Sequence, residues 1–270
     1  MPDPPEDRRD FLTTARARAV LAEHPERLRA VRGDLQMHTT WSDGRDPPEG
    51  VARAAAVRGY AYVALTDHSA GQRIPRGMDA ATIKEQAKHV RRLNEDLEEE
   101  GENFRVLHGL EMNLDPEGEG DTDPEVLAGL DVVLGAFHSR LRVEEDQTER
   151  YLAAVRNPSL DVLAHPRGRR FDARRGLTAD WPRVFAAGAD AGTALEINAF
   201  PDRQDLQVGL LTFARESGAW ISFGTDAHRI EELANMRLAV AAAAIADFPR
   251  ERIINELSLE EIRERPWRAE

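Results

Sequence analysis

The sequence contains no cysteine, and only two of its 36 basic residues, Lys84 and Lys88, are lysines. The absence of cysteine excludes disulfide bonds and thiolate metal ligands. No apolar run approaches the roughly 20 residues of a membrane-spanning helix, and the N-terminus does not read as a signal peptide. We therefore expect a cytoplasmic protein with no membrane association.

The chain also lacks a basic excess, since its net charge is −13. A surface of this charge does not attract a polyanion as a whole. A chain of 270 residues with 41% hydrophobic residues suits one large domain with a single core. Nothing in the sequence indicates an obligate protein partner.

Polar side chains of a restricted kind follow a series of short apolar runs. The runs read as strands and cover residues 33–35, 60–66, 104–110, 132–137, 161–164, 193–198 and 220–225. The residues at or just past their ends are Gln36, His38, Asp43, Asp67, His68, Glu111, His138, His165, Glu196, Asn198, Asp226 and His228. Imidazole nitrogens and carboxylate oxygens are ligands of divalent transition metals. Their recurrence at the same place in successive units predicts that they converge on one metal centre.

The spacing of these units favours a barrel. Most steps between the polar groups are near 30 residues, the length of one strand and one crossover helix. Segments with helical periodicity lie between the strands, at 48–58, 80–99, 147–155, 181–189 and 206–217. Alternating strands and helices indicate a parallel sheet, and a closed parallel barrel carries its functional residues at the C-terminal ends of the strands.

We expect an α/β fold, a distorted TIM-like (β/α)7 barrel with the metal site at the C-terminal ends of its strands. An open doubly wound sheet is the alternative, and it fits seven convergent strand ends less well. Residues 33–270 should form the barrel domain, with helices from residue 240 onward. Residues 1–32 should form a partly helical extension, with one or two helices over 11–32 covering the barrel's N-terminal face.

The motifs themselves resemble those of the polymerase and histidinol phosphatase (PHP) family. They are GDLQMHTTWSDG at 33–44, TDHS at 66–69, GAFHS at 135–139, AHP at 164–166 and GTDAH at 224–228. The resemblance covers roughly residues 33–240. It is strongest to the C-terminal PHP domain of bacterial family X DNA polymerases, which also have a stretch similar to LEINAFPDR at 195–203.

The resemblance implies the same barrel with two or three divalent metal ions, and hydrolysis of phosphate esters by a metal-activated water. Carried over onto this chain, one ion is held by His38, Glu111 and Asp226, a second by Glu111, His138 and His165, and a third by Asp43, His68 and His228. Glu111 would bridge two ions and be catalytic. Asp67 would orient a ligand or accept a proton. Ligand type alone does not choose among Mn, Zn and Fe.

One position departs from the family pattern. The first motif usually begins with histidine, and this chain has Gln36 there. We expect Gln36 to be a weak metal ligand through its amide oxygen, or else to hydrogen-bond a bound water or the substrate.

A group of arginines follows His165 at the expected rim of the barrel: Arg167, Arg169, Arg170, Arg174 and Arg175. Guanidinium groups match phosphate oxygens well. We therefore predict that Arg167, Arg169 and Arg170, together with Arg203, bind substrate. The alternative is a solvated loop whose arginines pair with nearby acids.

Three functions fit the sequence. The first is a metal-dependent phosphoesterase acting on a nucleotide, a nucleic-acid 3′ end or a small phosphomonoester. The second is a small-molecule phosphatase resembling histidinol phosphatase, which the acidic surface favours. The third is a non-catalytic metal-binding module, and the nearly complete ligand set argues against it.

Overall fold

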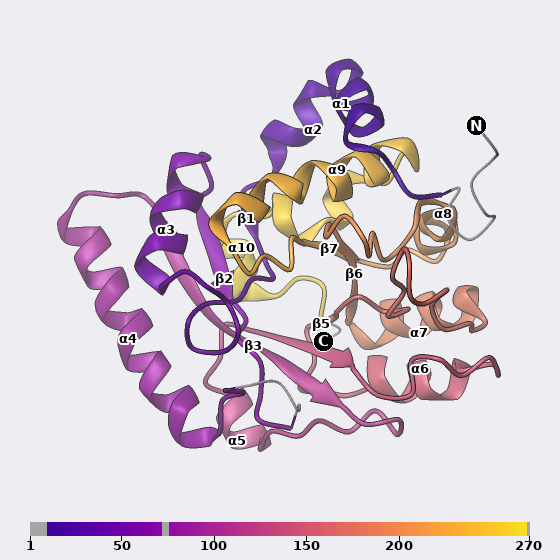
Figure 1. Cartoon of the computed structure of the whole chain (residues 1–270), viewed down its shortest axis with the longest axis horizontal. Coiled ribbons are helices and arrows are strands. Elements are labelled where there is room, and N and C mark those ends of the chain that lie inside the picture. The colour runs from indigo at the N-terminus through magenta and orange to yellow at the C-terminus, as the bar shows by residue number, and fades with distance from the viewer. Residues whose placement is uncertain (1–9, 72–75, 269–270) are drawn as a thin grey trace.

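The computed structural model describes residues 10–71 and 76–268, in which seven strands form one sheet (Figure 1). In sheet order these are β1 (Gly33–Asp34), β2 (Tyr62–Leu65), β3 (Arg105–Leu114), β4 (Val132–Phe137), β5 (Val162–Leu163), β6 (Ala194–Asn198) and β7 (Ile221–Gly224). All neighbouring strands are parallel. A doubly wound sheet reverses its strand order part-way, so the sequential order excludes that alternative and confirms the barrel.

Helices lie outside the strands. Those between strands are α3 (Pro48–Val57), α4 (Ala80–Glu99), α5 (Pro124–Leu127), α6 (Thr148–Val155), α7 (Trp181–Ala191) and α8 (Val208–Glu216). After β7 come η2 (Ile230–Asn235), α9 (Met236–Ile245), η3 (Arg250–Arg252), η4 (Ile254–Glu256) and α10 (Leu259–Glu264). The bounds of α4 match the prediction, and its N-cap Asp79 accepts a hydrogen bond from the Thr82 amide at 2.8 Å. The sequence did not indicate α5, because four residues are too few to show periodicity.

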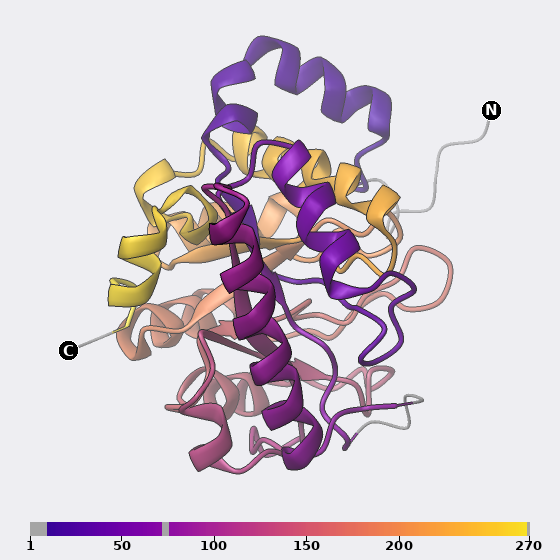
Figure 2. The ribbon, with the colours of Figure 1, turned by 90° about the vertical axis from the view of Figure 1, so that its left-hand side faces the viewer.

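The N-terminal helices α1 (Thr14–Glu23) and α2 (Pro25–Ala30) do not cover the barrel's N-terminal mouth. They lie along α9 on the outside of the molecule (Figures 1 and 2). The mouth is filled instead by the C-terminal segment, where Ile254, Ile262 and Trp267 pack against the inward-facing side chains of the strands. The prediction that these helices cover the barrel's N-terminal face was wrong, because α1 buries its apolar face, which includes Val20 and Leu21, against the apolar helix α9.

The alternation along the strands separates an inner from an outer core. Leu134 and Ala136 of β4 face the barrel interior, whereas Val133 and Phe137 pack outward against the helices. In β3 the same alternation turns Glu111 inward. His108 faces outward, where its Nε2 lies 3.0 Å from Gln86 Oε1 of α4.

Strand β3 is longer than the sequence suggested and places Glu111 within the strand. Its first half pairs with β2, from Arg105 to His108, and its second half pairs with β4, from Gly109 to Leu114. β4 pairs with a part of β3 further along the chain than β2 does, so β3 must continue past residue 110 for its backbone groups to form hydrogen bonds with β4. The backbone at Glu111 is therefore held in a ladder.

The barrel closes between β7 and β1 through backbone and side-chain hydrogen bonds, and just past the two strands Met37 pairs with Ala227 in a parallel bridge. The Asn255 side chain donates to the carbonyls of Gly33 and Phe223, both at 2.9 Å, and accepts from the Phe223 amide at 2.5 Å. Further along, the Thr225 hydroxyl donates to Asp34 Oδ2 at 2.5 Å. We call this junction of β7 and β1, with Asp34, Thr225 and Asn255, the seam.

Among the described helices, none combines the length and apolar character needed to cross a bilayer.

Candidate metal centre

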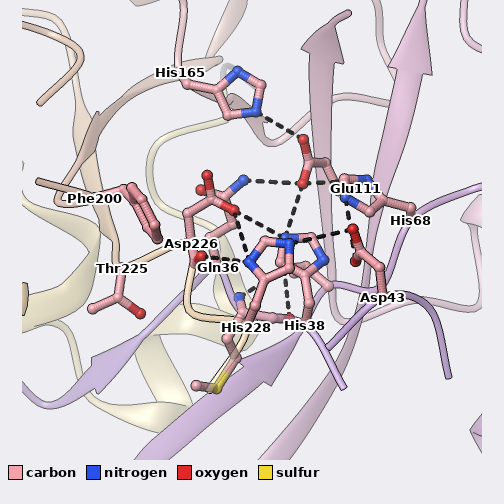
Figure 3. A network of polar contacts seen from close by, with 12 residues as sticks. Gln36, His38, Asp43, His68, Glu111, His165, Phe200, Thr225, Asp226 and His228 are labelled. Carbon is pink, nitrogen blue, oxygen red and sulfur yellow. Dashed lines mark hydrogen bonds and ion pairs between the residues drawn. The ribbon is translucent and has the colours of Figure 1, made fainter. Parts of the chain in front are cut away.

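Four imidazoles surround one carboxylate at the C-terminal end of the barrel. Glu111 is fully buried, and its Oε1 lies 2.8 Å from His165 Nε2 and 3.1 Å from His138 Nε2. Its Oε2 lies 3.2 Å from His38 Nε2 and 3.6 Å from His68 Nδ1. Figure 3 shows Glu111 between His165 on one side and His38 and His68 on the other, which come from separate loops. The sequence spread these residues over more than a hundred positions, and the fold brings them together.

Nitrogen atoms surround both oxygens of Glu111. A carboxylate offers about four lone-pair positions. Nε2 of His38, His138 and His165 and Nε2 of Gln36 lie within 3.2 Å of its oxygens, and His68 Nδ1 lies further away, at 3.6 Å. Burial raises the pKa of Glu111, but the neighbouring histidines outweigh it and hold the pKa well below the usual range. Burial lowers the pKa of His68 to about 3, and burial also lowers the pKa of His138. Neutral imidazoles facing a carboxylate are the donor set that a divalent cation requires.

A second carboxylate lies next to Glu111. Asp226 Oδ1 is 3.1 Å from His38 Nε2, and Asp226 Oδ2 is 3.2 Å from Arg203 Nη1. Burial opposes ionisation of Asp226, but Arg203 and His38 keep its pKa below the usual range. Burial likewise opposes protonation of His38, yet Asp226 and Glu111 raise its pKa well above the usual value. The space between the two carboxylates therefore favours positive charge.

The outermost group consists of Asp43, His68 and His228. Asp43 Oδ2 is 3.4 Å from His228 Nε2, and Asp43 Oδ1 is 3.7 Å from His68 Nε2. The side chains of Asp43 and His228 are 30% and 28% exposed, so this end of the centre opens to solvent. His228 Nδ1 lies 2.9 Å from the Asp226 carbonyl, which only accepts, so Nδ1 donates to it and the ring turns Nε2 toward Asp43.

Asp67 orders the loop that carries Asp43. Its Oδ1 accepts from the amides of Thr39 and Ser42 at 2.8 and 3.1 Å and from the Ser42 hydroxyl at 2.6 Å. Its Oδ2 accepts from the Thr39 hydroxyl and from Gln86 Nε2, both at 2.7 Å. Both oxygens are thus engaged by protein donors. Asp67 holds the β1–α3 loop in place, and its position gives no direct support to a proton-accepting role.

The orientation of the Gln36 amide follows from a chain of hydrogen bonds. The Phe200 amide donates to Asn198 Oδ1 at 3.0 Å, so the Asn198 amide nitrogen points the other way. That nitrogen donates to Gln36 Oε1 at 3.1 Å, and Gln36 Nε2 then donates to Glu111 Oε2 at 3.1 Å. Gln36 therefore presents a donor to Glu111, and its oxygen is engaged by Asn198. The ligand role of Gln36 stays a prediction.

Glu196 lies behind His165. It is fully buried, and its Oε2 accepts from the His165 backbone amide at 2.6 Å. Burial, followed by repulsion from Asp226 and Glu111, raises the pKa of Glu196 well above the usual value. The contact between Glu196 and the His165 amide holds the backbone of the His165 loop in place.

The predicted arginines lie in different surroundings. Arg169 is buried and bonds to Asp10, to the Arg203 carbonyl and to the Gln204 carbonyl, with its guanidinium 4.1 Å from the centre of the Phe11 ring. Arg167 donates to two carbonyls and to Gln207, and Arg170 forms an ion pair with Asp202. Arg203 alone of the four predicted arginines reaches a metal-site carboxylate.

Sequence reasoning missed the position of Arg142. Burial, then the charges of Arg203, Arg170 and Arg142, lower the pKa of Arg174 to about 10. The Nε of Arg174 is buried and has no hydrogen-bond partner among the described residues. These guanidiniums repel one another, and an anion placed among them would relieve the repulsion. No local signal in the sequence places Arg142 beside Arg174.

Groups of side chains close enough to share a cation include two of the three predicted ligand sets, and the remaining group contains His68 where His165 was predicted. Groups of ligand atoms lying within 4.8 Å of one another are found at His38, Glu111 and Asp226, at His68, Glu111 and His138, and at His38, Asp43, His68 and His228. In addition, Nδ1 of His68, which faces Glu111 Oε2 at 3.6 Å, is buried without a hydrogen-bond partner among the described residues. Such an unpaired group is rare in proteins unless a ligand or ion accounts for it.

A sequence model described as the PHP domain matches residues 34–199. The chain belongs to the PHP family. This confirms the resemblance drawn from the motifs. The PHP chain is 38% identical over 236 residues to the DNA polymerase/3′-5′ exonuclease PolX of Bacillus subtilis, a match that covers 87% of this chain but only 41% of that protein. It is 29% identical over 237 residues to a probable phosphatase of Edwardsiella ictaluri, covering 82% and 89% of the two chains.

The fold is also found in a solved structure. The histidinol phosphate phosphatase of Lactococcus lactis, determined with zinc, L-histidinol and phosphate, superposes with a TM-score of 0.62 at 17% identity. The superposition covers 81% of this chain and 95% of that one. At this identity the likeness establishes the fold.

Proposed function

We propose that this PHP protein is a metal-dependent phosphoesterase that hydrolyses phosphate ester bonds. The observation that carries the proposal is the buried Glu111 carboxylate encircled by four imidazoles, next to a second buried carboxylate, Asp226. Membership of the PHP family and the phosphatase and exonuclease names of its relatives support it.

The centre would hold two or three divalent ions, of Mn, Zn or Fe. His38, Glu111 and Asp226 would hold one, His138, His165 and Glu111 the next, and Asp43, His68 and His228 the most exposed. When bound, such ions polarise phosphoryl oxygens and acidify water.

The chain's own residues prepare this chemistry. Asp67 holds the loop that bears Asp43, and Glu196 holds the loop that bears His165. The Gln36 amide donates to the side of Glu111 that faces His38, which limits where that carboxylate can turn. Arg203 binds Asp226 through one nitrogen, and with 22% of its side chain exposed it can donate to a phosphate oxygen through another.

The substrate class follows from the arginines around Arg203. Arg203, Arg174 and Arg142 form a guanidinium group that begins at the metal centre. A nucleic-acid strand, or a nucleotide with two or three phosphates, would place its second phosphate among these arginines. We therefore place a nucleic-acid 3′ end or nucleotide first among the substrates.

A small phosphomonoester is the second candidate, and the net charge of −13 favours it because long polyanions are repelled by the rest of the surface. The non-catalytic alternative predicts metal binding without turnover.

One screen separates these functions. Purified protein with Mn²⁺ is incubated with p-nitrophenyl phosphate, bis(p-nitrophenyl) phosphate and labelled single-stranded DNA, and Glu111→Gln protein is run in parallel. Turnover of DNA or the diester supports the first function, and turnover of the monoester alone supports the second. No turnover of any substrate, with metal bound, would leave the non-catalytic module.

A further inference from the structure

A cavity lies apart from the metal centre, between the N-terminal helices and the barrel wall. Its volume is about 780 Å³, within the range of small-molecule sites. Its lining comes from α1 and α2, from the turn before β2, and from η2 and the start of α9. Figure 2 shows α1 and α2 lying across α9, with the last turn of α3 beneath them.

The floor of the cavity is apolar. Leu21, Val31, Leu233 and Met236 are buried side chains that line it, and Tyr60 adds an aromatic ring. Leu28 also lines it and is 43% exposed, so the apolar lining reaches the opening of the cavity.

The rim of the cavity is cationic. Four of the thirteen lining residues are arginines, namely Arg18, Arg29, Arg58 and Arg237, and none of the lining residues is acidic. Arg58 and Arg237 donate only to backbone carbonyls. Arg18 and Arg29 form no ion pair with the acids in the described part of the chain. In a chain of net charge −13, an uncompensated group of four arginines around an apolar floor is a local exception.

The cavity is separate from the phosphoesterase centre. Tyr60 precedes β2, which begins at Tyr62, whereas the metal-site residue His68 follows the other end of the same strand. At β2 the cavity and the metal centre therefore lie at opposite ends of the strand, although η2, which also lines the cavity, follows the metal-centre residue His228 along the chain. None of the lining residues belongs to the metal centre.

We propose that this cavity binds a small organic anion that joins an apolar ring or short acyl body to a carboxylate, sulfonate or phosphate group. The apolar body covers Leu28 and lies on the floor formed by Leu21, Leu233 and Met236. The acidic group is held by Arg18 and Arg29, whose guanidiniums have donors to spare. Arg58 and Arg237 already donate to backbone carbonyls, and they add positive charge to the rim.

The test uses a pair of fluorescent probes that differ in one group. 1-Anilinonaphthalene-8-sulfonate has an aromatic body with a sulfonate, and N-phenyl-1-naphthylamine has the same body without it. Fluorescence titration of the full-length protein with each probe gives two dissociation constants. Because no turnover is measured, the result is independent of whether the phosphoesterase proposal holds.

Three variants locate the binding. Arg18→Glu combined with Arg29→Glu reverses the rim charge at two exposed helix positions. Arg16→Glu makes the same change on α1 at an exposed residue that does not line the cavity, and it is the matched control. Ala22→Trp fills the cavity at an exposed lining position. Thermal unfolding followed by circular dichroism establishes that each variant is folded.

We expect saturable binding of one sulfonate probe per chain, weakened at least about tenfold by the double arginine variant and unchanged by Arg16→Glu. Binding of the neutral probe should change less than about twofold in the double variant, and Ala22→Trp should weaken both probes. The proposal is overturned if the sulfonate probe does not saturate, if Arg16→Glu weakens it as much as the double variant does, or if Ala22→Trp leaves both probes bound as in the wild type.

Discussion

Thr225 donates its hydroxyl to the carboxylate of Asp34 across the seam, where the last strand meets the first. Burial raises the pKa of Asp34 to about 6, although the hydrogen bonds from Thr225 oppose the rise. Gln36, two residues after Asp34, and Asp226, the residue after Thr225, both lie at the candidate metal centre. The contact between Thr225 and Asp34 therefore also fixes how the β1 side and the β7 side of that centre are placed relative to each other.

The seam makes a stability prediction. Asn255→Ala removes three buried hydrogen bonds and leaves the Phe223 amide and the Gly33 carbonyl without their side-chain partner. A buried group left unpaired costs about 1–3 kcal/mol. We expect a loss of that size or greater in the free energy of unfolding from urea titration. Asn157→Ala is the control, because Asn157 is only half-buried and water can replace its bonds; an equal loss in both variants would contradict a special role for the seam.

Glu111→Gln should empty most of the metal centre. The change removes the negative charge at the point where four imidazoles converge, so the two groups that share Glu111 should lose affinity together. We expect fewer bound ions by elemental analysis and a fall in turnover of at least about 10²-fold. His108→Ala, on the outer face of the same strand, should keep both. Wild-type turnover in Glu111→Gln would show that the hydrolysis arises elsewhere.

Gln36→His should distinguish the two roles considered for Gln36. If position 36 contacts a metal, imidazole will bind it more strongly than an amide, and activity should appear at lower Mn²⁺ with little change at saturation. If Gln36 acts through its hydrogen bonds to Glu111 and Asn198, the variant should lower the maximal rate and leave the metal dependence unchanged. Metal titrations of activity for the two proteins, run side by side, decide between the roles.

The effect of Arg174→Ala should depend on how many phosphates the substrate carries. We expect KM for single-stranded DNA to rise about tenfold while KM for p-nitrophenyl phosphate changes little, because a monoester phosphate reaches only the metal centre and Arg203. Arg183→Ala is the comparison, since that exposed guanidinium on α7 is paired with Glu149. Equal rises in KM for both substrates would instead indicate that Arg174 contacts the scissile phosphate.

The barrel and the convergence of the histidines could be predicted from the sequence, because both are encoded by a pattern that repeats along the chain. Apolar runs with a polar residue at the end recur with each strand, and parallel strands bring their ends together. The extension of β3 beyond residue 110 depends on where β4 pairs with it, which leaves no local trace.

Contacts between distant segments account for most of what the sequence did not reveal. The arginines after His165 looked alike in sequence, yet Arg169 is buried against Asp10 and Phe11 from the N-terminal extension. The direction of the Gln36 amide depends on the Phe200 amide, two hydrogen bonds away through Asn198. The closing of the seam by Asn255 depends on a short 3₁₀ turn near the C-terminus. Neither residue type nor spacing predicts such contacts.

The position of Glu111 within β3 bears on how the centre would exchange its ions. Its backbone pairs with β4 on one side and with the segment that bears His68 on the other, whereas the remaining ligands lie past the ends of their strands. An ion could then leave through displacement of the most exposed ligands, Asp43 and His228, without separation of the strands. Metal content and melting temperature should then vary independently: chelation would release the ions at temperatures where the barrel is still fully folded.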